Sequence, residues 1–303
     1  MRAHMSWLLA MVLASASCAN SKDRATSNKT PTAQHSASSH ATPGNAPPNY
    51  AVNDTLLPHR ELTIISQVLG EMRRINIYVP PGYDASPNAR YPILYMPDGG
   101  TKEDFPHLTH TVDGAIRAGQ IRPIVVVGIE NTKRRRDLTG PTEVAKDKKA
   151  APVVGGSAKF RRFIRYELFP KVMGQIRGDG TTGIIGESLA GLFIVETFFV
   201  APRMFDIYVG IDPTLGWNAG ELARNAVERL KVGSWQGRAL HLSSAGKGRN
   251  DGNSVYVAPL AAALEKHPPE GLRWIYTPKP DEKHSTIYRA TKLAILRWMF
   301  PTG

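Results

Sequence analysis

The stretch Thr182-Gly-Ile-Ile-Gly-Glu-Ser-Leu-Ala-Gly191 places Ser188 between a short apolar run and Leu189–Val200, which has the composition of a helix. A serine on a sharp strand-to-helix turn projects its hydroxyl group from the edge of a sheet. Such a turn needs a glycine two positions before the serine and a small residue two positions after it, and Gly186 and Ala190 meet these requirements. The stretch therefore predicts an α/β fold with Ser188 as a candidate nucleophile.

Apolar runs and segments with helical spacing alternate on both sides of this turn. Short apolar runs predict buried strands at Ile93–Met96, Ile124–Ile129, Thr182–Ile185, Ile207–Ile211 and Ala239–Leu242, and a last strand is expected at Arg273–Thr277. Helical spacing is found in Leu108–Ala118, Ala158–Gln175, Leu189–Val200, Gly220–Val232, Val255–Lys266 and Ile287–Met299. Leu62–Gln67 and Arg74–Val79 predict an antiparallel hairpin or edge pair. The alternation predicts a mostly parallel central sheet with helices on both faces, in the α/β-hydrolase arrangement.

A serine hydroxyl group is a poor nucleophile unless a base accepts its proton. In the α/β-hydrolase arrangement the histidine comes last in the chain order, after the serine and the acid. His284 lies between the last predicted strand and the last predicted helix. The alternative, His267, lies at a predicted helix end beside Pro268 and Pro269. We therefore predict that His284 is the general base.

The carboxylate that would orient His284 is expected after the strand at Ala239–Leu242. Asp251 is the acidic residue in the loop there, although Asn250-Asp251-Gly252-Asn253 is also a good turn sequence. Glu282, two residues before His284, is a second candidate. A serine–histidine pair without an acid is the third alternative, and the sequence leaves the three open.

The tetrahedral intermediate of ester cleavage needs two N–H donors for its oxyanion. The backbone of Leu189, directly after the candidate nucleophile, is expected to supply one of them. The second is expected from the loop after Ile93–Met96, where Asp98-Gly99-Gly100 lets the backbone approach a substrate closely. Gly99 is the first candidate for this donor and Gly100 is the alternative.

Several segments resemble the family of α/β-hydrolases named Putative esterase, which includes esterase D and the enterochelin esterase-like proteins. Tyr91–Gly99 resembles its opening strand, Arg136–Thr139 its R-D-L-T element, Phe160–Pro170 its F-x-x-F-I-x-x-E-L-x-P helix, Asp212–Trp217 its S-P-S-L-W-W turn, and Glu282–His284 its E-x-H element. Gly216 departs from this pattern, since the family has a tryptophan there. The resemblance covers residues 60 to 300.

The resemblance implies Ser188 and His284 as the catalytic pair. It places Arg136 near the mouth of the active site, where a guanidinium group could hold an anionic ligand. Trp217, in the matching turn, is a further candidate substrate-binding residue. The family includes esterases for siderophores, thioesters and feruloyl sugars as well as mycolyltransferases, so the resemblance leaves the substrate open.

The N-terminus has a different composition from the rest of the chain. Arg2 and His4 precede the apolar run Trp7–Ala14, a pattern typical of a signal peptide ending near residue 18. Cys18 is the only cysteine and stands where a lipoprotein signal places its lipidated residue. Residues 19–50 are rich in Ser, Thr, Asn, Ala and Pro, which predicts a disordered tether before an α/β-hydrolase domain at 51–303. We expect an exported protein, periplasmic or held in the bacterial envelope by a lipid on Cys18.

The formal net charge is +12, and residues 1–50 contain four basic residues and one acidic residue, so most of the excess belongs to the domain. Export argues against nucleic acid as a partner and favours an anionic ester or an acidic surface. The expected activity is hydrolysis of small carboxylic esters through an acyl-enzyme. It needs no metal or other cofactor, and no cluster with metal-ligand spacing is visible. The alternatives are an acyltransferase of the same fold and a non-catalytic envelope binding protein.

Overall fold

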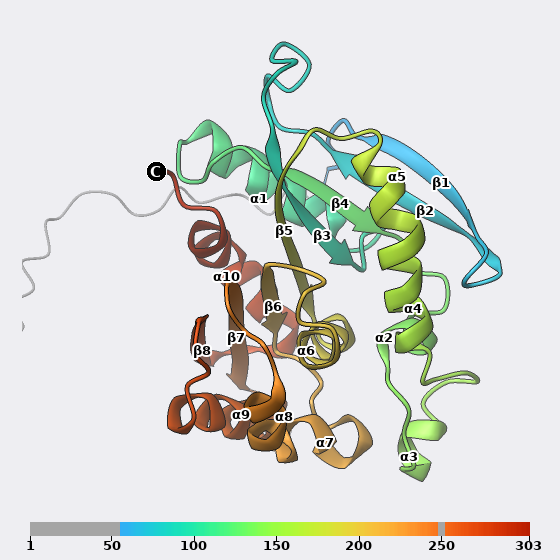
Figure 1. Cartoon of the computed structure of the whole chain (residues 1–303), viewed down its shortest axis with the longest axis vertical. Coiled ribbons are helices and arrows are strands. Elements are labelled where there is room, and N and C mark those ends of the chain that lie inside the picture. Colours follow the sequence, from blue (N-terminus) through green and yellow to red (C-terminus); the bar gives the residue numbers. More distant parts are fainter. Residues whose placement is uncertain (1–54, 248–251) are drawn as a thin grey trace, which may run out of the picture. The chain divides into compact units, whose positions relative to one another are not determined.

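The computed structural model describes residues 55–247 and 252–303, which form an eight-stranded sheet with helices on both faces (Figure 1). The strands are β1 (Arg60–Ser66), β2 (Glu71–Tyr78), β3 (Tyr91–Pro97), β4 (Val125–Ile129), β5 (Gly178–Glu187), β6 (Ile207–Ile211), β7 (Arg238–Lys247) and β8 (Leu272–Lys283). Their order is β1-β2-β4-β3-β5-β6-β7-β8. β1 and β2 form the predicted antiparallel hairpin, and β3 to β8 are parallel. The predicted fold class is confirmed.

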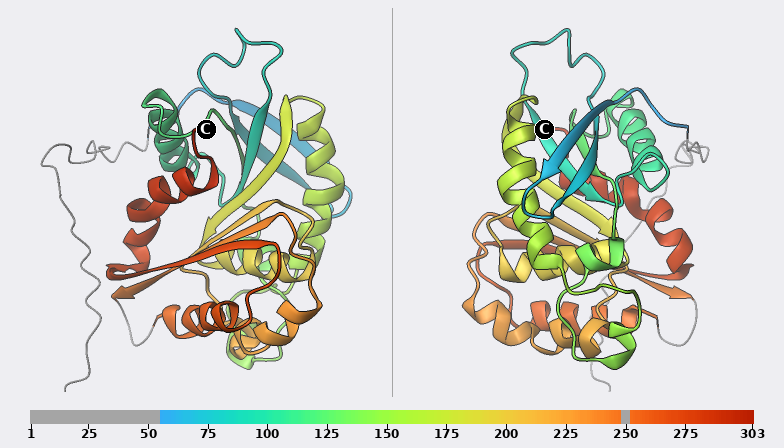
Figure 2. Two further views of the ribbon diagram at one scale, coloured as in Figure 1. Left: turned by 60° about the vertical axis from the view of Figure 1, so that its left-hand side comes forward. Right: turned by 90° about the vertical axis from the view of Figure 1, so that its right-hand side faces the viewer.

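The two faces of the sheet carry separate hydrophobic cores. One face is covered by α1 (Phe105–Arg117) and α10 (His284–Met299), which lie next to each other in both views of Figure 2. The other face is covered by α4 (Ser157–Phe163), α6 (Leu189–Val200) and α9 (Ser254–Lys266). The side chains of β3, β4 and β6 are buried throughout, as are residues 183–186 of β5, because helices cover both faces.

The helix predicted at Gly220–Val232 is not continuous. Gly220 ends the short helix η2 (Trp217–Gly220), and the remaining residues are divided at Asn225 into α7 (Glu221–Arg224) and α8 (Ala226–Val232). Just before the predicted start, Asn218 has a φ of 50°, and its backbone N–H donates to Asp147 while its side-chain oxygen accepts from the Thr142 hydroxyl group.

The segment between β4 and α4 contains two short helices that were not predicted, α2 (Arg134–Leu138) and α3 (Ala145–Lys148). The helix predicted at Ala158–Gln175 is α4 followed by the π-helical turn η1 (Ile164–Leu168) and α5 (Phe169–Met173). In η1, the Glu167 carboxylate accepts hydrogen bonds from the Ser66 hydroxyl group and from the N–H groups of Gln67 and Val68. The π-helical turn therefore holds the tip of the β1–β2 hairpin.

The end of the chain differs from the prediction in a way that bears on the site. β8 extends beyond Thr277 because it keeps pairing with β7 as far as Lys283. Its prolines are tolerated since β8 is an edge strand. α10 then begins at His284, three residues earlier than predicted, so His284 belongs to a helix and not to a loop. No helix within the described ranges is both long and apolar enough to cross a bilayer.

Candidate active site

Ser188 occupies the turn between β5 and α6 with a strained backbone, φ 61° and ψ −120°. A Cβ atom on Gly186 would lie 2.6 Å from the Cβ atom of Ala190. A Cβ atom on Gly191 would lie 2.9 Å from Pro213. The turn therefore requires glycine at 186 and a small residue at 190, as expected from the sequence, and it also requires glycine at 191.

The turn after β6 contacts Ser188 directly. The Ser188 N–H donates to Ile211 in β6 at 3.1 Å, and the Thr214 N–H donates to the Ser188 carbonyl oxygen at 3.0 Å. The hydroxyl oxygens of Ser188 and Thr214 are 3.3 Å apart. Ser188 is therefore fixed against the start of the Asp212–Trp217 segment.

The same turn also contacts His284. The Nδ1 atom of His284 donates to Oδ2 of Asp212 at 2.6 Å, and Asp212 is only 2% exposed. This hydrogen bond is the main reason why the pKa of His284 is raised above its usual value of 6.5, although partial burial opposes the shift. The turn after β6 thus contacts both predicted catalytic residues, through Asp212 with His284 and through Thr214 with Ser188. The two catalytic residues therefore lie at the same end of the sheet.

Asp212 is itself held by donors that do not depend on His284. Its Oδ1 atom accepts from the Ala245 N–H at 3.0 Å, and its Oδ2 atom accepts from the Asn253 side-chain amide at 3.2 Å. The same amide donates to the Asp212 carbonyl oxygen at 2.8 Å. A carboxylate with a backbone donor and an amide donor keeps one orientation, as an orienting acid requires.

The two predicted acids have different outcomes. Asp251 lies outside the described residues. The Glu282 carboxylate, near the end of β8, accepts at 2.6 Å from the hydroxyl group of Thr286 in the first turn of α10. Asp212 was missed by the sequence reasoning, although it stands where the S-P-S-L-W-W turn of the family has its first serine. An acidic residue replacing a hydroxyl group directly after a buried strand was the signal that could have found it.

The candidate oxyanion donors are placed as follows. The Leu189 N–H opens α6, where helix geometry provides no intrahelical acceptor. The Gly99 N–H donates to the Ile129 carbonyl oxygen at 3.0 Å, and a Cβ atom on Gly99 would collide with the backbone of Gly128. The Gly100 N–H donates to the Glu103 carboxylate at 2.7 Å. The Glu103 side chain can rotate away from the Gly100 N–H, whereas the Ile129 carbonyl oxygen is fixed in a strand. The geometry therefore favours Gly100 over Gly99 as the second oxyanion donor.

Trp217 is 9% exposed, and its indole N–H donates to the Gly140 carbonyl oxygen at 2.9 Å. It borders a cavity of about 60 Å³ together with Leu192 and Leu222. The polar edge of the indole ring is therefore used inside the protein, and only a small space adjoins the ring.

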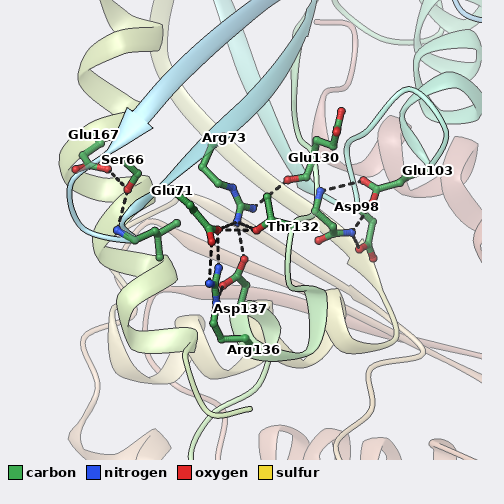
Figure 3. A network of polar contacts seen from close by, with 12 residues as sticks. Ser66, Glu71, Arg73, Asp98, Glu103, Glu130, Thr132, Arg136, Asp137 and Glu167 are labelled. Atoms are coloured by element: carbon green, nitrogen blue, oxygen red, sulfur yellow. Dashed lines mark hydrogen bonds and ion pairs between the residues drawn. The ribbon is translucent and has the colours of Figure 1, made fainter. Parts of the chain in front are cut away.

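Arg136 belongs to a network of ion pairs that links the hairpin to α2 (Figure 3). Its Nη1 and Nη2 atoms donate to Glu71 at 2.9 and 2.6 Å, and its Nε atom donates to Asp137 at 2.7 Å. The hydrogen bond from Arg136 is the main reason why the pKa of Glu71 is lowered to about 2. Arg73, fully buried in β2, donates to Asp137 at 2.6 Å. All three nitrogen atoms of the Arg136 guanidinium group thus have acidic partners, which favours a role in holding the loop.

This geometry gives a prediction for Arg136→Lys. The KM values for an anionic ester and for a neutral ester of the same acyl group are expected to change by the same factor. The melting temperature is expected to fall by several degrees, because lysine cannot replace the paired bonds to Glu71, and loss of such bonds costs about 1–3 kcal/mol. Steady-state kinetics with matched esters and a thermal melt measure both effects. A selective loss on the anionic ester, by about tenfold, would instead show that Arg136 binds substrate.

Arg134 is the cation of the basic run whose charge acts on His284, where it lowers the pKa of the imidazole group. Its guanidinium group binds both carboxylate oxygens of Asp98 at 2.6 Å, while 36% of the side chain stays exposed. A cavity of about 380 Å³ is lined by Lys133–Arg136 and Ala151–Val153.

Within residues 55–247 and 252–303, no group of three or more His, Cys, Asp or Glu side chains is arranged to hold a metal ion.

A mostly parallel eight-stranded sheet with a serine on the strained turn after β5 defines an α/β-hydrolase. Residues 66–211 match the model of the family described as Putative esterase. The predicted resemblance to this family is therefore confirmed over these residues.

Two relatives and one solved structure illustrate the similarity. The ferri-bacillibactin esterase BesA of Bacillus subtilis is 29% identical over 55% of this chain and 62% of its own length. The match therefore spans less than two thirds of that relative. The apo-salmochelin esterase of Escherichia coli O6:H1 is 27% identical, with 80% of each chain covered. The crystal structure of an IroE-like serine hydrolase from Shewanella oneidensis is 26% identical, covers 80% of each chain and superposes with a TM-score of 0.74.

Proposed function

We propose that the protein is a serine esterase in which Ser188 is the nucleophile, His284 the general base and Asp212 the orienting acid. The observation that carries the proposal is the turn after β6, which places Asp212 on the Nδ1 atom of His284 and Thr214 beside the Ser188 hydroxyl group. A serine nucleophile, an imidazole that serves as its base and a carboxylate that orients the imidazole are the three groups needed for acyl transfer.

In the proposed reaction, Ser188 Oγ attacks the ester carbonyl carbon while His284 Nε2 accepts the hydroxyl proton. The tetrahedral oxyanion accepts hydrogen bonds from the N–H groups of Leu189 and Gly100. Its collapse breaks the bond to the leaving alcohol, which takes the proton back from His284. Water then attacks the acyl-enzyme by the same steps and releases the acid. Asp212 keeps the Nδ1 proton in place, so that Nε2 is available as the acceptor, and it stabilises the imidazolium that forms.

The proposed substrate class is a siderophore-type ester with anionic groups away from the scissile bond. The two curated relatives are named as esterases of bacillibactin and salmochelin. In this chain, the cavity lined by Lys133–Arg136 and Ala151–Val153 offers the apolar stems of these side chains and the charges of Lys133 and Arg135, while Arg134 and Arg136 already bind acidic side chains. Guanidinium groups bind planar oxygen anions with paired hydrogen bonds, which suits catecholate oxygens.

We also propose that the protein is exported and held at the envelope by a lipid on Cys18. The support is the N-terminal pattern of a short basic start, an apolar run and a single cysteine. Residues 1–54, which include the signal segment, Cys18 and the tether, lie outside the described residues.

The esterase proposal predicts that a fluorophosphonate probe labels the purified protein at Ser188, because an activated serine reacts with it. The labelled peptide is identified by mass spectrometry. Absence of labelling would instead support a non-catalytic binding protein.

The substrate proposal predicts that a ferric tricatecholate trilactone is cleaved with a higher kcat/KM than p-nitrophenyl acetate. Acyl transfer to added glycerol faster than to water would identify an acyltransferase.

A further inference from the structure

Glu187, the last residue of β5, directs its side chain to the face of the sheet opposite α6. Successive side chains of a strand alternate between the two faces. A Cβ atom on Gly186 would meet Ala190 and Ile194 of α6, so Gly186 faces that helix. Ile185 packs in the core formed with α1 and α10. Glu187 shares the face of Ile185, and its carboxyl group therefore lies on the side of the sheet where α1 and α10 begin.

The Glu187 carboxyl group has an unusual environment for an acid. Its Oε1 atom is buried and has no hydrogen-bond partner among the described residues. The ionisable groups that interact with the Glu187 carboxyl group are His284 and Tyr288 of α10, Asp104 before α1, Asp98 after β3 and Asp212 after β6. Arg134 of α2 acts on His284. Burial is the main reason why the pKa of Glu187 is raised to about 7, and the three aspartates add to the shift. The attraction of His284 opposes it.

The interaction between Glu187 and His284 is mutual. After the hydrogen bond from His284 to Asp212, the charge of Glu187 is the next influence that raises the pKa of His284. His284 is thus under the influence of one carboxylate bonded to Nδ1 and a second one that extends from the strand carrying the nucleophile. No contact considered so far uses the second carboxylate.

We propose that Glu187 is a positioning residue that acts through His284, because its carboxylate stabilises the imidazolium that forms when Ser188 gives up its proton. This role rests on the proposed esterase function. In its charged form Glu187 makes His284 a stronger base, and in its protonated form it does not. Glu187, directly before the nucleophile, therefore controls the base strength of His284 near neutral pH.

The first test is the pH dependence of Glu187→Gln, measured as kcat/KM for a neutral p-nitrophenyl ester. His284 must be neutral to accept a proton, so activity rises with pH through the His284 pKa. Without the Glu187 charge, that pKa is expected to fall by roughly one unit, and the acid limb moves to lower pH. The alkaline plateau is expected to fall about threefold to tenfold, because the developing imidazolium loses a nearby charge. An acid limb at the wild-type position would overturn the proposal.

The second test does not depend on esterase activity. NMR titration of the His284 imidazole C–H signals, assigned by their loss in His284→Asn, is expected to show the same downward shift in Glu187→Gln. Glu282→Gln is the matched control, because Glu282 is close to His284 in the chain but bonds to Thr286. Its titration should match wild type. A shifted imidazole pKa in a protein without esterase activity would reject the proposed function alone, whereas an unshifted pKa in an active esterase would reject the role of Glu187 alone.

Stability gives a third readout, which tests whether the Glu187 carboxyl group is buried as the structure shows. The folded-state pKa of Glu187, about 7, lies above its unfolded value of 4.5. Its contribution to stability is therefore complete below pH 4.5 and is lost as the pH rises to about 7. Glu187→Gln is expected to raise the melting temperature relative to wild type at pH 8 but not at pH 4.5. Should the amide variant misfold, Glu187→Asp, which keeps the charge, is expected to retain the wild-type acid limb, and a shifted limb would count against the proposal.

Discussion

Replacing Ser188 with alanine is expected to lower kcat/KM for a short p-nitrophenyl ester by a factor on the order of 10⁴–10⁶. The residual rate would come from substrate binding and the oxyanion donors alone. The melting temperature is expected to stay close to wild type, because the contact of the hydroxyl group in the structure is a long one, 3.3 Å to Thr214. The strained φ of 61° is unaffected, since alanine has the same backbone restrictions.

The matched control is Ser285→Ala, which removes an exposed serine hydroxyl group directly next to His284. This control should keep wild-type kinetics. A Ser188→Ala protein within tenfold of wild type would show that another group attacks the ester. Fluorophosphonate labelling of the two variants separates these results, because only Ser285→Ala should react.

The second large effect is expected for Asp212→Asn, with a loss of roughly 10³–10⁴ in kcat and little change in KM. The asparagine Oδ1 atom can keep the bond from the Ala245 N–H, so its Nδ2 group would face His284 Nδ1. Two donors cannot pair, and the imidazole would then hold its proton on Nε2, where it cannot accept one from Ser188. The magnitude follows serine proteases, in which the same change imposes the wrong tautomer.

Asp251→Asn and Glu282→Gln test the two acids predicted from the sequence. If Asp212 orients His284, both variants should stay within fivefold of wild type in kcat. A loss of 10³ or more in Asp251→Asn, with Asp212→Asn nearly as active as wild type, would assign the acid to Asp251. Thermal melts of all three proteins show whether a loss of activity follows a loss of folding.

Most strands and long helices could be predicted because hydrophobic periodicity depends on neighbouring residues. The strand-to-helix turn at Ser188 could be predicted for the same reason, since its steric requirements lie within six residues. The predictions failed where distant contacts decide the structure. The left-handed backbone at Asn218, just before α7, accompanies contacts with Asp147 and Thr142, and the extension of β8 depends on its pairing with β7.

The candidate site follows the same division. Ser188 and His284 are signalled by local sequence and chain order. The contact between Asp212 and His284 joins residues 72 positions apart, and only the parallel register of β6, β7 and β8 brings them together. Arg136 lies in a recognisable motif, yet its partner Glu71 comes from the β1–β2 hairpin, 65 positions earlier in the chain. Charge in a sequence does not show which acid will pair with it.

The start of α10 at His284 has a consequence for how the protein would respond to mild stress. The imidazole group is attached where an edge strand meets the C-terminal helix, and both kinds of element tend to open before the centre of a sheet. Detachment of this last βα unit would remove the base while the serine turn, between central strands, remained folded. Activity would then act as a reporter of local opening, lost and regained with the docking of the final helix and not with unfolding of the whole domain.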